Sequence, residues 1–206
     1  MDHAASPPAP LSTLTAFTSS LSTTLYANPH SRSHSSTITT AAIDSIRDRV
    51  LSELFGLATA AARRDWDVIF TSGATAALKL VAEAYPWGRS SRFRYLSESH
   101  TSLVGVRGPA LEKGARVDAM GVADLDSLRE DECETMFAYS AQCNATGVRL
   151  GLGLGQTIKQ RYPNSVVLLD GASYLATSVL DLSSVPLDAA PDFVACSFYK
   201  LFVRFL

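Results

Sequence analysis

Cysteine and histidine are scarce in this sequence. Only three cysteines and four histidines occur among 206 residues, and the cysteines have neither metal-ligand spacing nor the even number of a disulfide framework. A reducing compartment is the simplest interpretation of such a composition. We therefore expect a cytoplasmic protein that holds no metal ion.

An excess of one charge and a long apolar run are also missing. Lysine and arginine (18) nearly balance aspartate and glutamate (20), so the net charge of −2 gives no reason to expect nucleic acid or an anionic membrane as partner. No apolar run approaches the roughly 18 residues of a membrane-spanning helix. The N-terminus lacks the basic and apolar regions of a secretory signal.

The residues that are present are typical of a globular enzyme domain. Apolar residues make up 47% of the chain and charged residues 18%, which is enough apolar material to bury a core. Residues 1–10 are rich in proline, alanine and serine, and we expect a disordered leader there. Residues 11–206 contain no linker and are expected to form one domain.

The order of the apolar segments predicts the fold class. Helical spacing indicates helices over 11–26 and 37–55, the second ending at Gly56. Short apolar strands then alternate with loops and helices, which predicts an α/β protein with a mostly parallel sheet flanked by helices. The expected strands are 67–71, 93–96, 115–118, 135–139, 166–169 and 193–196, and the expected helices between them are 76–84, 103–106, 124–129 and one ending over 158–162.

Polar residues follow the strands of this sheet, where the loops after the carboxyl ends form a ligand crevice. Asp170 ends the apolar run 165–169, and Lys200 follows the last strand. Pyridoxal phosphate requires such a pair, because lysine forms a Schiff base with its aldehyde and aspartate pairs with its protonated pyridine nitrogen. The other polar residues at strand ends are Gly73, Thr75, His100 and Asn144.

The turn over 71–75 and His100 each have two interpretations. Gly73 permits a tight turn whose following N–H groups bind an anion, with the Thr75 hydroxyl adding a donor. The alternative is an ordinary turn with an N-cap threonine. His100 can stack on a pyridine ring and transfer protons there, or it can cap the next helix.

Each of the remaining strand-end residues, taken alone, also has two interpretations. Asn144 can donate its amide to the phenolate oxygen of the cofactor, or hold a turn. Asp170 either meets a cationic partner or caps a helix. Lys200 can instead extend its charge into solvent from an apolar stem. Five consecutive strand ends with such chemistry favour a cofactor site.

With these residues, the chain resembles the class V aminotransferase-type proteins of pyridoxal phosphate (PLP) fold type I. Within that superfamily it most resembles the N-terminal, cysteine-desulfurase-like domain of the molybdenum cofactor sulfurase family. The most specific segments are Asn28-Pro29-His30-Ser31 and Ser197-Phe198-Tyr199-Lys200. The resemblance extends over residues 14–202 and includes the segments 70–79 and 99–107.

The resemblance implies roles around the cofactor ring. His100 stacks on the ring, Asn144 meets the phenolate oxygen and Asp170 meets the pyridine nitrogen. Lys200 is the Schiff-base lysine, and Lys200 and His100 are the expected catalytic residues.

The resemblance also implies a phosphate site and a reaction. Ala74, Thr75 and Ser197 hold the phosphate. Family members take sulfur from L-cysteine through a cysteine persulfide, and the sulfurase passes it to the molybdenum cofactor. L-cysteine and the molybdenum cofactor are therefore the expected partners, and a homodimer is left open.

The C-terminal residues depart from the family pattern. Residues 203–206 diverge from the Gly-containing continuation of the family, and none of the three cysteines matches the family's sulfur carrier. We expect residues 11–206 to be a partial large domain, incomplete at its C-terminus, without the small and C-terminal domains and inactive alone. The alternatives are another class V activity, such as an aminotransferase or a selenocysteine-lyase-like enzyme, and a non-catalytic remnant.

Overall fold

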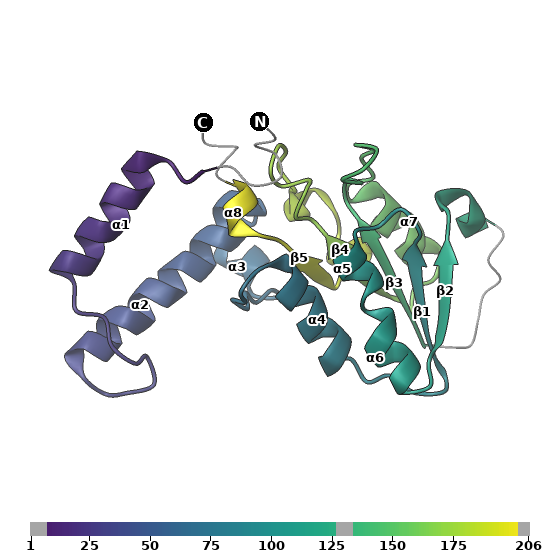
Figure 1. The fold of residues 1–206 in the computed structure, drawn as a ribbon, viewed down its shortest axis with the longest axis horizontal. Helices are drawn as coiled ribbons and strands as arrows, with labels where there is room; N and C mark the ends of the chain where they lie inside the picture. The colour runs from purple at the N-terminus through teal and green to yellow at the C-terminus, as the bar shows by residue number, and fades with distance from the viewer. Residues whose placement is uncertain (1–7, 127–133, 202–206) are drawn as a thin grey trace.

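The computed structural model describes residues 8–126 and 134–201, and in them five parallel strands form one sheet (Figure 1). The strand order is β2-β1-β3-β4-β5, and every neighbouring pair is parallel. This arrangement confirms the predicted α/β class. The strands are β1 (Ser91–Leu96), β2 (Arg116–Met120), β3 (Glu134–Ser140), β4 (Val166–Asp170) and β5 (Phe193–Ala195).

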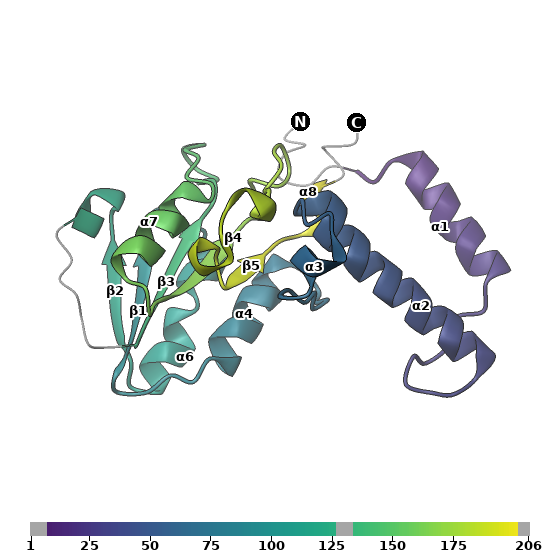
Figure 2. The same cartoon turned by 180° about the vertical axis from the view of Figure 1, so that it is seen from behind.

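Helices cover both faces of the sheet, because its strands are apolar on both sides. Within β3, Met136 and Ala138 pack into one core cluster, whereas Phe137 and Tyr139 pack into the other. Successive side chains of a strand point to opposite faces, so each face has its own core. Figures 1 and 2 show the helices of the two faces: α4 (Ala74–Ala84), α5 (Thr101–Val104) and α6 (Arg107–Glu112) on one, and α7 (Gly153–Arg161) on the other.

The pairing register brings the carboxyl ends of the central strands to one edge. Ser140 at the end of β3 lies opposite Asp170 at the end of β4, and Asp170 lies opposite Ala195 of β5. The loops that leave these strands therefore start side by side. Functional side chains from distant parts of the sequence can meet at this edge.

The Tyr139 hydroxyl fixes α7 to the sheet, and its loss gives the first testable prediction. The buried hydroxyl donates to the Gly151 carbonyl and accepts from the Gly155 N–H, both at 2.9 Å, and burial raises the pKa of this phenol. Tyr139→Phe leaves both groups unsatisfied, and we expect a loss of about 1–3 kcal/mol in the free energy of unfolding in urea. Tyr26→Phe, which removes an exposed bond to Ser20, serves as control. Equal midpoints for the two variants would contradict this role.

An N-terminal arm projects away from the sheet (Figures 1 and 2). Helix α1 (Leu11–Thr23) contributes no buried residue to the core. The helix expected over 37–55 begins three residues earlier, because the Ser33 side chain accepts the Ser36 N–H, and its last turn widens into a π-helix. The remaining elements of the arm and its base are α2 (His34–Arg49), the π-helix η1 (Val50–Leu54) and α3 (Ala60–Arg63).

Short helices complete the described part of the chain. The helix expected over 124–129 is a 3₁₀ turn as far as Asp126, and the rest of it lies outside the described residues. Residues 1–7 of the expected leader and Cys133 also lie outside them. The short elements are η2 (Val122–Asp126), η3 (Leu182–Ser184), η4 (Leu187–Ala189) and α8 (Phe198–Leu201). Among the described helices, none combines the length and apolarity needed to cross a bilayer.

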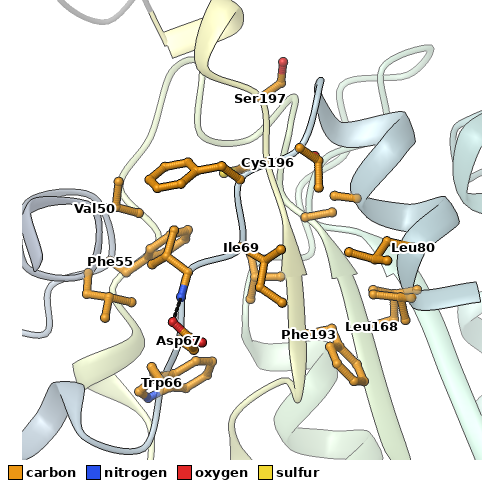
Figure 3. Close-up of a pocket in the computed structure, with 18 of the residues that line it drawn as sticks. Val50, Phe55, Trp66, Asp67, Ile69, Leu80, Leu168, Phe193, Cys196 and Ser197 are labelled. Atoms are coloured by element: carbon orange, nitrogen blue, oxygen red, sulfur yellow. Dashed lines mark hydrogen bonds between the residues drawn. The ribbon is translucent and has the colours of Figure 1, made fainter. Parts of the chain in front are cut away.

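The strand predicted over 67–71 is wrong. Among the described strands, none pairs with this segment, which instead lines an apolar cavity of about 200 Å³ together with β5 (Figure 3). Ile69 is 68% exposed and Phe193 of β5 is 40% exposed. Residues 67–71 have the apolar composition of a strand. A strand also needs a neighbouring strand to which it can hydrogen-bond, and the apolar cavity separates this segment from β5.

Candidate active site

A second cavity of about 200 Å³ lies at the carboxyl edge of the sheet and gathers most of the predicted residues. It is lined by residues that follow β1, β3, β4 and β5 and by the first turn of α4. Six of the seven predicted site residues line it, namely Ala74, Thr75, His100, Asn144, Asp170 and Lys200. We call this cavity the edge pocket.

Asp170 supplies a buried carboxylate to the edge pocket. Its Oδ1 accepts the Ala172 N–H at 3.0 Å, so the carboxylate caps a turn rather than the helix of the alternative interpretation. Burial raises its pKa, while the Ala172 N–H and the charge of Lys200 oppose that rise. A carboxylate in this position is stabilised by a cation or a strong donor in the pocket.

Lys200 lies in α8, immediately after β5, and faces the edge pocket. Its side chain is half-buried, and its backbone N–H donates to the Ser197 carbonyl at 3.3 Å. The charge of Lys200 favours the ionised form of Asp170, and both residues line the edge pocket. The amine and the carboxylate thus share one cavity.

His100 both caps a helix and lines the pocket. Its Nδ1 accepts the Ser102 N–H at 3.1 Å, which makes it the N-cap of α5. The neutral imidazole therefore carries its proton on Nε2. The two interpretations of this histidine are compatible, since one ring nitrogen holds the helix and the rest of the ring remains at the pocket.

The first turn of α4 forms another wall of the pocket. Gly73 is its N-cap, with a φ of 144° that favours glycine, and a Cβ atom placed there would meet nothing within 4 Å. The N-cap threonine of the alternative interpretation is wrong, because Thr75 lies inside the helix and its hydroxyl contacts the Ser102 hydroxyl at 2.8 Å. The first N–H groups of this helix have no partner within it and can bind an anion.

Ser197 is the predicted residue that does not line the edge pocket. It lies at the end of the apolar cavity beside β5, and Gly73 lines both cavities. The residue is 3% exposed, and within the described residues its Oγ has no hydrogen-bond partner. In Figure 3 this oxygen points away from the apolar cavity. A buried hydroxyl without a partner fits a ligand atom that completes it.

Six polar residues of the edge pocket are not among the site residues predicted from the sequence: Ser72, Ser102, Ser140, Gln142, Ser173 and Tyr199. Gln142 carries a buried Oε1 for which the described residues provide no hydrogen-bond partner. All six lie within four positions of a predicted site residue. No sequence motif marks these residues, and only the register of the strand ends could have indicated that they lie at the pocket.

The two described cysteines, Cys143 and Cys196, lie outside the edge pocket. The pKa of the Cys196 thiol is raised to about 11 by burial and by the charge of Asp170. The Thr146 hydroxyl and N–H lower the pKa of Cys143. Within the described residues, no three histidine, cysteine or acidic side chains are grouped to hold a metal ion.

A parallel sheet whose carboxyl edge gathers an amine, a buried carboxylate and an imidazole is the arrangement that the resemblance to PLP-dependent proteins of fold type I leads us to expect. A solved structure of cysteine desulfurase CsdA from Escherichia coli shares this fold, with a TM-score of 0.76 over 98% of this chain and 51% of that one, at 22% identity.

Sequence comparison gives the family. The chain belongs to the aminotransferase class-V family, which matches residues 1–202. It is 40% identical over 224 residues to molybdenum cofactor sulfurase of Homo sapiens and 41% identical over 215 residues to that of Aspergillus clavatus. Each alignment covers 98% of this chain and 24% of the relative, so the chain spans about a quarter of the length of these relatives.

Proposed function

We propose that the edge pocket binds PLP and that the chain forms a cysteine-desulfurase-like domain, which takes sulfur from L-cysteine for delivery to the molybdenum cofactor. The observation that carries this proposal is the convergence of Lys200, Asp170 and His100 on one pocket. The relatives named molybdenum cofactor sulfurase and the fold shared with a cysteine desulfurase support the choice of substrate.

The phosphate end of the cofactor fits the first turn of α4. Ala74 and Thr75 would bind it through backbone N–H groups and the Thr75 hydroxyl, where the helix dipole favours an anion. Ser197 would add the buried hydroxyl that has no partner within the described residues. Gly73 leaves open space where a side chain would otherwise stand.

The ring end fits the buried part of the pocket. Asp170 would hold the proton of the pyridine nitrogen, His100 would stack on the ring, and Asn144 would donate to the phenolate oxygen. Lys200 would supply the amine for the aldehyde carbon and afterwards hold or move the substrate's α-proton at Nζ. When bound, PLP supplies a ring that withdraws electrons from the substrate.

The acceptor of the sulfur is proposed to lie outside the described residues. Desulfuration breaks the C–S bond of L-cysteine, passes the sulfur to a thiol as a persulfide and leaves L-alanine. Cys143 and Cys196 do not line the edge pocket, and burial holds the pKa of Cys196 high. Residues 11–206 would form the cofactor-binding part of a cytoplasmic enzyme, and a homodimer stays open.

An assay of alanine and sulfide from L-cysteine tests this function. We compare the chain with an extended protein, in which it is joined to the sequence that follows the matched region in the human relative. With PLP and a reductant, we expect equal amounts of alanine and sulfide from the extended protein, and from the chain alone no more than free PLP gives. Positioning of substrate and thiol supplies up to about 7–11 kcal/mol of the barrier reduction.

Three other outcomes contradict parts of the proposal. A keto acid product that depends on an added amino acceptor would indicate an aminotransferase. Release of selenide from L-selenocysteine with inert L-cysteine would indicate a selenocysteine lyase. Full turnover by the chain alone would place the sulfur carrier among its own cysteines, and Cys143→Ser and Cys133→Ser would then identify it.

A further inference from the structure

Ser102 connects two residues of the proposed cofactor site. Its hydroxyl lies 2.8 Å from the Thr75 hydroxyl, and its backbone N–H donates to Nδ1 of His100 at 3.1 Å. Ser102 itself lines the edge pocket between them. One residue of α5 therefore contacts both the proposed phosphate-binding hydroxyl and the proposed ring-stacking imidazole.

The contact between the two hydroxyls has a direction once an anion is bound. Each hydroxyl has one proton to donate and can also accept. A phosphate group only accepts at its charged oxygens, so the Thr75 O–H must donate to it. The Ser102 O–H must then donate to the Thr75 oxygen, and a chain of this kind polarises each hydroxyl along it.

We propose that Ser102 is a positioning residue that orients and polarises the Thr75 hydroxyl toward the cofactor phosphate, an inference that rests on the proposed function. The bond is exposed in the pocket, so it contributes little to the stability of the fold. Its effect should appear in the binding of ligands that carry the phosphate. The backbone contact to His100 survives replacement of the side chain.

Binding of PLP and of pyridoxal, which lacks the phosphate, separates positioning from structure. Dissociation constants are measured by absorbance titration for the wild-type chain, Ser102→Ala and Ser102→Thr. The control is Thr101→Ala, which removes an exposed hydroxyl from the same helix. Thermal unfolding of each variant and the ³¹P chemical shift of bound PLP are recorded beside the titrations.

We expect Ser102→Ala to raise the dissociation constant for PLP roughly three- to ten-fold and to leave that for pyridoxal unchanged. Ser102→Thr should restore the wild-type value, and Ser102→Ala should add little in a Thr75→Val background. A Ser102→Ala chain that binds PLP like the wild type, or loses both ligands equally, overturns the inference alone. A wild-type chain that binds no PLP overturns the proposed function and this inference together.

Discussion

Lys200→Ala is expected to abolish covalent attachment of PLP to the chain. The wild-type chain mixed with PLP should show the visible absorption of a lysine-bound cofactor, and borohydride should fix the cofactor on the peptide that contains Lys200. Lys200 is half-buried and lines the edge pocket together with Asp170, whereas the other three lysines do not line it, so the proposed site predicts that Lys200 alone reacts. Mass spectrometry after reduction measures the loss.

A matched lysine variant is needed because PLP reacts slowly with any exposed amine. Lys79→Ala serves this purpose, since Lys79 lies on the exposed side of α4 and pairs with Glu83 at 3.6 Å. It should retain the full visible band and the full adduct. A Lys200→Ala chain that still yields a stoichiometric adduct at one other lysine would remove Lys200 from the site.

Asp170→Asn is expected to lower alanine formation by the extended protein by roughly 100-fold or more. The substitution keeps an oxygen for the Ala172 N–H, which Asp170 now accepts at 3.0 Å, but removes the negative charge. Without that charge residue 170 would no longer hold the proton of the pyridine nitrogen, which the ring would need in order to withdraw electrons. PLP content should change by only a few-fold, because the proposed contacts to the phosphate and to Lys200 would remain.

Measuring both activity and PLP content makes the prediction for Asp170→Asn specific. Loss of activity and of PLP content in equal measure would show that Asp170 only supports binding, and unchanged activity would place it outside the reaction. Asp188→Asn, an exposed aspartate of η4, controls for the removal of one charge. Its activity and PLP content should match those of the unchanged protein.

The sequence predicts the strands of the sheet wherever an apolar segment is enough to identify a strand. The central strands β1, β3 and β4 carry their own signal because they are mostly buried on both faces, as Phe137 and Met136 of β3 illustrate. The segment 67–71 carries the same signal and forms no strand. Hydrophobic alternation and β-branched residues are features of a single segment, whereas a β-ladder forms only when two segments hydrogen-bond to each other.

The sequence also predicts part of the candidate site. Asp170 and Lys200 each follow an apolar strand, so the topology of a parallel sheet brings them to one edge. Ser102 and Gln142 could not be found in this way, because serine and glutamine near a loop have no distinctive pattern. Ser197 was assigned to the phosphate by resemblance, and its position beside the apolar cavity depends on where β5 ends and α8 begins.

The register that sets Ser140 opposite Asp170, and Asp170 opposite Ala195, also limits how this sequence can change in length. A single residue inserted into β4 would turn Asp170 to the other face of the sheet, toward the core beneath α7. The same insertion in a surface connection would leave the strand ends where they are. Insertions and deletions that evolution accepts in this domain must therefore concentrate in the connections, while β3, β4 and β5 keep their lengths and the edge pocket keeps its carboxylate.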